Sequence, residues 1–212
     1  RAAGLGKPPK EFRALSSHLH HNVDIVIVGA GLNGLLAAKS LINTNHDILL
    51  VDFDNHLGGI INNSAKISSI DNQSPQEWVK STVEAIEKSK NIKILKNTLV
   101  TTYNYINHLI AVEDKHVGSR PSENKVNNIL HKIRTDYVIL CNGHIERFLS
   151  FQNNDLPGIM LASSFEKYIC RYGTLPSKEP VIFSNNSNSN SLIYSLINQG
   201  YKPKAYIDSR SG

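Results

Sequence analysis

The strongest constraint on the fold of this chain is a glycine motif placed between two apolar patterns. Residues 24–34 read DIVIVGAGLNG, in which Gly29, Gly31 and Gly34 form G-x-G-x-x-G. A buried-strand pattern precedes the motif and a helical pattern follows it. A second apolar run, ILLV, then ends at Asp52, 18 positions past Gly34. A strand, the glycines, a helix and an acid in this order are the fingerprint of a Rossmann-type dinucleotide-binding unit.

Each residue type in the fingerprint has a chemical reason. Gly29 permits a tight turn out of the strand, Gly31 lets the backbone approach a pyrophosphate, and Gly34 lets the helix pack on the strand. The first N–H groups and the positive dipole end of the helix attract phosphate. Asp52 is expected to accept hydrogen bonds from the adenosine ribose, each worth about 1.5–3 kcal/mol, and to disfavour NADP by repelling its 2′-phosphate. The alternative is a degenerate unit whose glycines serve only the turn.

A set of cofactor-binding residues is predicted around this fingerprint. Gly59 belongs to a Gly-Gly pair after the second strand, and Gly143 follows a later strand ending near Cys141. Both positions suit a further backbone approach to the cofactor, although a simple turn explains the same residues. The predicted cofactor-binding residues are Gly29, Ala30, Gly31, Leu32, Asn33, Gly34, Asp52, Phe53, Gly59 and Gly143.

Composition excludes several classes of protein. The net charge of +5 is spread along the chain without a basic stripe interleaved with aromatics, so nucleic-acid binding is not expected. No apolar run reaches the roughly 18 residues of a membrane span. Cys141 and Cys170 are 29 positions apart without C-x-x-C, which favours small core residues in a reducing, cytoplasmic setting over a disulfide. We find no catalytic array and no metal-ligand spacing, so neither is predicted.

The chain is expected to be α/β, a Rossmann-like FAD/NAD(P)-binding domain with an inserted β-meander and the start of a second Rossmann-like unit. Residues 1–22 read as a linker, 23–175 as the dinucleotide-binding domain, and 176–212 as the beginning of a second, truncated unit. The histidines at positions 18, 20 and 21 fit a solvated linker better than a metal site. Because the chain begins with Arg1 and stops just after a strand pattern, it reads as a fragment of a longer polypeptide.

Shorter patterns fill in the remaining elements. Ser74, Pro75 and Glu77 predict a capping box opening a helix through about residue 89, in which Trp78 packs inward. Short β patterns predict a meander before a final core strand at 137–141; they lie at 92–95, 99–105, 109–112 and 129–133. A helix is expected at about 161–172. The final strand–helix–strand pattern has an Asn/Ser loop without glycine, so it is not expected to bind a dinucleotide in the usual way.

Four segments carry a resemblance to a known family. They are RAAGLGKPP at 1–9, HLHHNVDIVIVGAG at 18–31, ERFLSFQNNDLPGIMLASSFEKYICRYG at 146–173 and VIFSNN at 181–186. The chain resembles the two-dinucleotide-domain flavoproteins and, among them, the α (large) subunit of heterotetrameric sarcosine oxidase. The resemblance runs over essentially the whole chain. Leu32, Asn33 and Phe148 depart from it, because the family commonly has Pro, Ala and Pro at these positions.

The resemblance implies a cofactor, partners and a reaction. It implies that the fingerprint residues hold NAD in a subunit that assembles with β, γ and δ subunits. The family's enzyme oxidises sarcosine to glycine, with FAD in the β subunit and FMN at the α/β interface. Oxygen becomes hydrogen peroxide, and the one-carbon unit passes to tetrahydrofolate. The family's ferredoxin-like and folate-binding domains are not represented in these 212 residues.

Two other readings of the sequence stay open. In the first, the chain comes from the large subunit of an opine or glycine (cyanide-forming) dehydrogenase, in which the same site holds FAD. In the second, the bound dinucleotide is a permanent structural group and the chain is a platform for the assembly of other subunits.

Overall fold

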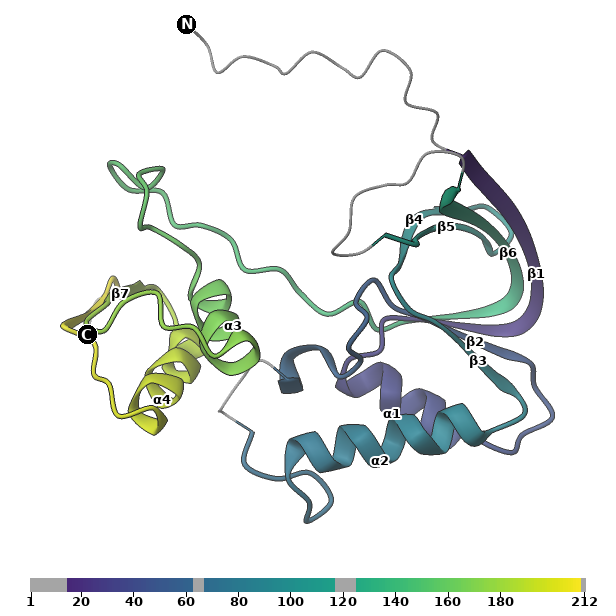
Figure 1. Ribbon diagram of the computed structural model, residues 1–212, viewed down its shortest axis with the longest axis horizontal. Helices are drawn as coiled ribbons and strands as arrows, with labels where there is room; N and C mark the ends of the chain where they lie inside the picture. Colours follow the sequence, from purple (N-terminus) through teal and green to yellow (C-terminus); the bar gives the residue numbers. More distant parts are fainter. Residues whose placement is uncertain (1–14, 63–66, 117–124, 211–212) are drawn as a thin grey trace, which may run out of the picture.

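The chain is built as two α/β units of unequal size (Figure 1). The computed structural model describes residues 15–62, 67–116 and 125–210. The larger unit contains a six-stranded sheet in the order β3-β2-β1-β6-β5-β4, and the smaller one a two-stranded sheet of β7 and β8. The strands of the large sheet are β1 (Leu15–Val28), β2 (Ile48–Val51), β3 (Ile92–Leu95), β4 (Thr98–Asn104), β5 (His108–Asp114) and β6 (Val126–Leu140).

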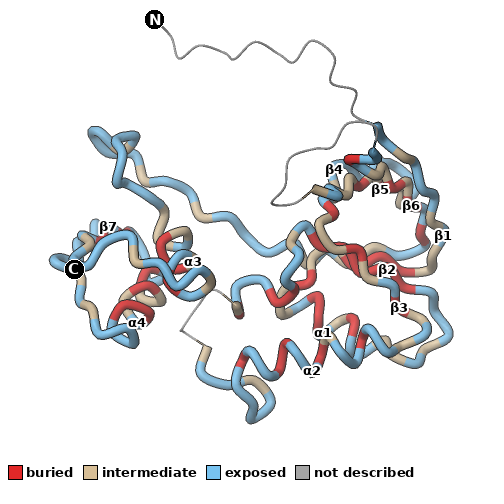
Figure 2. The backbone as a smooth tube through the Cα atoms, viewed as in Figure 1, coloured by how far each residue is buried: buried red, intermediate tan, exposed pale blue. Residues whose placement is uncertain are grey.

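Parallel strands form the core of the large unit. β1 pairs in parallel with β2 and β6, and β2 pairs in parallel with β3. All four residues of β2 are buried, as expected for a strand covered on both faces. Helices α1 (Leu32–Ser40) and α2 (Pro75–Lys88) lie on one face of these strands (Figure 1). Buried residues lie along both helices and along the strands that they cover (Figure 2). Their side chains form one apolar cluster, which includes Leu35, Leu50 and Trp78.

The predicted capping box opens α2. The Ser74 hydroxyl accepts a hydrogen bond from the Glu77 N–H at 3.3 Å, and the Glu77 carboxylate accepts one from the Ser74 N–H at 3.3 Å. Pro75 occupies the first helical position, where its missing N–H costs nothing. Trp78 is 1% exposed and donates its indole N–H to Asp71, which confirms its packing role.

The β-meander differs from its prediction at both ends. β4, β5 and β6 pair antiparallel in sequence, as a meander does, but residues 92–95 form β3, a parallel core strand beside β2. Residues 129–133 and 137–141 were expected as separate strands, whereas β6 runs through 126–140 without interruption. The polar sequence between them concealed this continuity, because its backbone pairs with β1 through the whole length of the strand.

β1 starts earlier than the sequence indicates. Residues 15–22, predicted as part of a linker, form the first half of β1, whereas residues 1–14 lie outside the described residues. This half of β1 pairs with residues 126–134 of β6, about 110 positions away. The extended conformation of residues 15–22 therefore depends on hydrogen bonds to a distant strand, and no local alternation of apolar residues indicates it. β1, β6, β5 and β4 curl together at one side of the molecule (Figure 1).

One of the three histidines of the predicted linker, the half-buried His21, contacts a buried histidine of this sheet. His21 Nε2 lies 2.8 Å from Nδ1 of the buried His131, whose Nε2 lies 3.0 Å from the Glu113 carboxylate. Burial, followed by the neighbouring His131, lowers the pKa of His21. Within the described parts of the chain, no group of three His, Cys, Asp or Glu side chains is arranged to hold a metal ion.

The smaller unit contains the predicted strand–helix–strand pattern, but it starts before the predicted boundary between residues 175 and 176. Helix α3, expected within the dinucleotide-binding domain of residues 23–175, shares its apolar core with α4 instead. β7 and β8 pair in parallel, and α3 and α4 pack together beneath them (Figure 1). Its elements are α3 (Ala162–Tyr172), β7 (Val181–Ser184), the 3-10 turn η2 (Ser187–Ser189), α4 (Asn190–Asn198) and β8 (Ala205–Asp208). Helix α3 ends at Gly173, whose φ of 60° is left-handed. Its core is formed by Phe165, Ile169, Ile182, Leu192 and Leu196.

The two cysteines are free thiols. Cys141 packs against the core of the larger unit, as expected for a small apolar residue. Cys170 differs from the prediction, because it is exposed at the C-terminal turn of α3. No helix in the described residues combines the length and the apolar character that crossing a membrane requires.

Candidate dinucleotide-binding site

The glycine motif forms the turn between β1 and α1. Gly29 has a φ of 97°, a backbone conformation that side-chain-bearing residues rarely adopt. A Cβ on Gly34 would lie 1.8 Å from the Gly29 carbonyl oxygen, so the helix packs directly on the turn. Gly31 differs from both, because a Cβ there would meet no atom within 4 Å. The open space at Gly31 therefore faces outward, where a ligand would approach the backbone.

The first turn of α1 has the features of an anion site. In the described residues no side chain forms a capping hydrogen bond at Gly31, and the first turn of α1 holds no acid. Helix α2 is different, because Ser74 and Glu77 close its N-terminus. Uncapped N–H groups with the positive end of a helix dipole favour a phosphate group. The open space beside the Gly31 backbone (the cradle) and this uncapped helix end therefore fit the pyrophosphate of a dinucleotide.

Asp52 lies beside the turn at the carboxyl end of β2. Its carboxylate accepts hydrogen bonds from the Ala30 N–H at 2.5 Å and from the Asp54 N–H at 2.7 Å. The residue is 8% exposed, and burial, opposed in part by these two N–H groups, raises the pKa of its carboxyl group. Each carboxylate oxygen can still accept a second hydrogen bond. Asp52 therefore fixes the glycine loop and keeps acceptor capacity for a hydroxyl group.

The other predicted residues surround this turn. Gly59 opens the 3-10 turn η1 (Gly59–Asn62), and a Cβ on it would lie 3.1 Å from the Gly31 Cα. The Gly58 N–H donates to the Ala30 carbonyl at 2.8 Å, which holds this second glycine pair against the first loop. The backbone of Cys141, just after β6, lies against Gly29. Gly143 comes two residues after Cys141 and has a φ of 67°.

Three predicted residues contribute side chains rather than bare backbone. Leu32 packs against the core from the first turn of α1, while Asn33 on the same turn is exposed. Phe53 is 68% exposed directly after Asp52, where its ring is free to cover a bound group. Leu32 packs against the core, and no side-chain atom of Asn33 lies within 4 Å of a Cβ built on Gly31, so these two departures from the family pattern leave the cradle open.

The corresponding turn of the smaller unit has a different construction. The Asn186 side chain accepts a hydrogen bond from the Asn188 N–H at 2.8 Å, and the Ser184 hydroxyl accepts one from the Asn186 N–H at 3.2 Å. Its polar side chains thus bind the backbone groups that a phosphate needs. This geometry supports the prediction that the second turn does not hold a dinucleotide.

A charged contact next to Asp52 was not predicted from the sequence. Arg171, in the last turn of α3, forms a bidentate ion pair with Asp54 at 2.5 and 2.8 Å. The same guanidinium lies 2.9 Å from His56 Nδ1. Arg171 and Asp54 are 117 positions apart, so no local pattern pairs them. The sequence offers only one hint of this ion pair, which is the presence of an acid, Asp54, two residues after Asp52.

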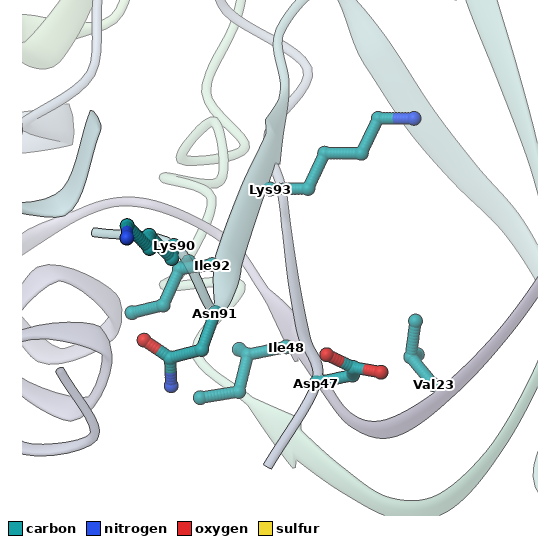
Figure 3. A pocket seen from close by; sticks show the side chains of 7 residues that line it. All are labelled: Val23, Asp47, Ile48, Lys90, Asn91, Ile92 and Lys93. Carbon is teal, nitrogen blue, oxygen red and sulfur yellow. The ribbon is translucent and has the colours of Figure 1, made fainter. Parts of the chain in front are cut away.

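Two cavities lie near the parallel strands, outside the turn itself. A cavity of about 220 Å³ lies at the amino ends of β2 and β3, the sheet edge opposite the glycine motif (Figure 3). It is lined by Val23, Asp47, Ile48, Lys90, Asn91, Ile92 and Lys93. A larger one of about 590 Å³ lies between the loop after β2, α2 and the end of α3. It is lined by His56, Leu57, Asn62, Val79, Lys80, Val83, Glu84, Lys96, Arg171 and Tyr172.

Comparison with known proteins agrees with this geometry. Residues 27–90, from the end of β1 through α2, match the model of the NAD(P)-binding Rossmann-like domain family. A sarcosine oxidase subunit α from Rhizobium meliloti (strain 1021) is 31% identical over 99% of this chain. One from Corynebacterium sp. (strain P-1) is 30% identical over 98% of it. The chain spans about a fifth of these relatives' length, 21% and 22% respectively.

The predicted resemblance to sarcosine oxidase α subunits is confirmed. Solved structures confirm the fold class as well. L-proline dehydrogenase from P. horikoshii superposes with a TM-score of 0.71 at 20% identity, over 92% of this chain and 36% of its own. Thioredoxin reductase from T. acidophilum gives 0.55 at 15% identity, over 88% of this chain and 55% of its own. The chain therefore has a Rossmann-like α/β fold, and its residues 27–90 match the NAD(P)-binding Rossmann-like domain.

Proposed function

We propose that this chain is the NAD-binding region of a sarcosine oxidase α subunit. The observation that carries the proposal is the combination of an open cradle at Gly31 with an uncapped α1 N-terminus. The similarity to sarcosine oxidase α subunits over nearly the whole chain supports the assignment to this enzyme. The residues proposed to hold the dinucleotide are Gly29, Ala30, Gly31, Leu32, Asn33, Gly34, Asp52, Phe53, Gly59 and Gly143.

Each part of the site has a proposed task. The N–H groups at the start of α1 bind the pyrophosphate, because no side chain of the described residues caps this end of the helix. Asp52 accepts the hydroxyl hydrogens of the adenosine ribose with the lone pairs that Ala30 and Asp54 leave free. Its negative charge favours NAD over NADP, whose 2′-phosphate would lie against the carboxylate.

The reaction proposed for the whole enzyme is the oxidative demethylation of sarcosine to glycine, with formation of hydrogen peroxide and methylene-tetrahydrofolate. We propose that the chain acts in it with β, γ and δ subunits, which carry or complete the FAD and FMN sites. A bound nicotinamide supplies hydride-accepting chemistry. The role proposed for this chain's own residues is to hold the dinucleotide and to orient it.

Release and identification of the bound nucleotide test this proposal. The full-length protein, purified with whatever subunits it carries, is denatured, and the released nucleotides are separated and identified by mass spectrometry. NAD in a one-to-one ratio with this chain is expected, beside FAD and FMN. FAD bound to this chain without NAD would instead support the large subunit of an opine or glycine dehydrogenase. A chain without any dinucleotide would contradict both functions.

A second measurement separates a redox role from a structural role of NAD. Sarcosine is added without oxygen, and the absorbance of reduced nicotinamide is followed near 340 nm. Unchanged NAD alongside reduced flavin is expected for a structural group. Reduction of NAD at the rate of flavin reduction would show that the dinucleotide takes part in electron transfer.

A further inference from the structure

Helix α3 is attached to both loops that flank the glycine turn. At its N-terminus, the Glu146 carboxylate accepts hydrogen bonds from the N–H groups of Ala162 and Ser163, at 3.3 and 2.8 Å. Glu146 lies three residues after Gly143, in the segment that leaves β6. At the other end of the helix, Arg171 binds Asp54 in the loop after β2. The helix thus joins two loops that come from separate strands of the large sheet.

The contact at Arg171 continues by hydrogen bonds to the glycine loop. The Arg171 guanidinium holds the Asp54 side chain, and the Asp54 N–H donates to Asp52 at 2.7 Å. The other Asp52 oxygen accepts from the Ala30 N–H at 2.5 Å. Three consecutive contacts therefore lead from the smaller unit to the backbone between Gly29 and Gly31. Arg171 and Asp54 side chains are only 19% and 21% exposed, so water weakens this ion pair less than a surface one.

Charge gives Arg171 a second effect on Asp52. The Asp54 carboxylate is close enough to raise the pKa of Asp52 by repulsion, although burial is the larger cause. The Arg171 hydrogen bonds are the main reason that the pKa of Asp54 falls to about 2. Without the guanidinium, the Asp54 carboxylate would lose its ion-pair partner while it stays beside the carboxylate of Asp52. Their repulsion would favour a different conformation of the loop.

We propose that Arg171 is a positioning residue of the dinucleotide site, which acts through Asp54 to orient the carboxylate of Asp52. This inference rests on the proposed function, because it assigns Asp52 to the adenosine ribose. It gives the smaller unit a role in cofactor binding without any contact between that unit and the cofactor. The bidentate geometry suits arginine in particular, since lysine binds a carboxylate as a point charge.

The test is NAD affinity in the full-length protein after removal of its nucleotide. Arg171→Met is expected to weaken NAD binding about tenfold, in the range of coupling between contacting residues. Arg171→Lys should recover part of the loss. Arg210→Met is the control, because Arg210 also forms an ion pair with an aspartate of the smaller unit, Asp208, at a shortest distance of 2.5 Å, and this pair has no hydrogen bond to the loop after β2 among the described residues. This control should bind NAD as the wild type does.

A double-mutant cycle distinguishes positioning from general stability. If Arg171 acts through Asp54, the variant with both Arg171→Met and Asp54→Asn binds NAD no more weakly than Asp54→Asn alone. A merely structural role would lower the unfolding midpoint and leave the affinity of the folded protein unchanged, and this result would overturn the inference. If Arg171→Met does not fold, Arg171→Lys and Asp54→Asn decide in the same assay, where unchanged affinity in both contradicts the inference.

The outcomes also separate this inference from the proposed function. A wild-type protein that binds NAD, with an Arg171→Met variant that binds it equally well, refutes the positioning role and leaves the function standing. A wild-type protein that binds no dinucleotide refutes the function and the inference together.

Discussion

Alanine substitution at two glycines of one motif should have opposite consequences. A Cβ at residue 34 would lie 1.8 Å from the Gly29 carbonyl oxygen, whereas real Cβ contacts essentially never fall below 3.0 Å. Helix α1 and the turn must therefore separate by more than an ångström. Neither the added Cβ nor the Gly29 carbonyl oxygen can move without the backbone. The loss of folding stability should therefore be at the upper end for overpacking, about 3 kcal/mol. For a unit of this size, the melting temperature should fall by about 6–12 °C in Gly34→Ala.

Gly31→Ala should leave the fold intact and abolish binding. Its Cβ would meet no protein atom within 4 Å, and its φ of −73° is accessible to alanine. Stability should therefore change by less than about 0.5 kcal/mol. A methyl group at the pyrophosphate would cost at least two charge-assisted hydrogen bonds of about 1.5 kcal/mol each, or about a hundredfold in affinity.

Thermal unfolding and NAD titration of the two variants, side by side, measure this contrast. The expected result is a stable Gly31→Ala protein that does not retain NAD and a Gly34→Ala protein with a lower melting temperature. If Gly31→Ala binds NAD with wild-type affinity, the open side of the turn does not face a pyrophosphate. If Gly34→Ala melts with the wild type, the close packing of α1 on the turn is wrong.

Three further predictions concern residues outside the turn. The pKa of Asp54 falls from 3.8 to about 2 on folding, so its contribution to stability is complete above pH 4 and is lost as the pH falls toward 2. Acid unfolding of Asp54→Asn should lack that part of the pH dependence, and an unchanged curve would contradict the ion pair. Glu166, 4% exposed, accepts hydrogen bonds from two serine hydroxyls of α4, at 2.9 and 2.7 Å. Glu166→Ala should destabilise the smaller unit by about 2 kcal/mol and Glu166→Gln by less; equal unfolding midpoints in urea would exclude this role. Ser74→Ala removes the cap of α2 and should cost about 1 kcal/mol without changing NAD affinity, whereas an affinity loss in titration would link α2 to the site.

The sequence was informative wherever a structural feature depends on neighbouring residues. The glycine motif, the capping box at Ser74 and the helix at about 161–172 each follow from residues close together in the sequence, and each was predicted. The extension of β1 back to Leu15 was not, because its polar residues pair only with a strand about 110 positions away. The Arg171–Asp54 pair was missed for the same reason. Its partners lie on separate units and meet only after both have folded.

The position of the diphosphate in the nucleotide-bound protein tests the central claim most directly. A crystal or cryo-electron microscopy structure of the full-length protein with NAD would locate it. We expect a diphosphate oxygen within about 3 Å of the backbone nitrogen of Leu32 or Asn33, in hydrogen-bonding range. Density for the nucleotide at another place, such as the Asn-rich turn before α4, would show that the glycine turn is not the dinucleotide site.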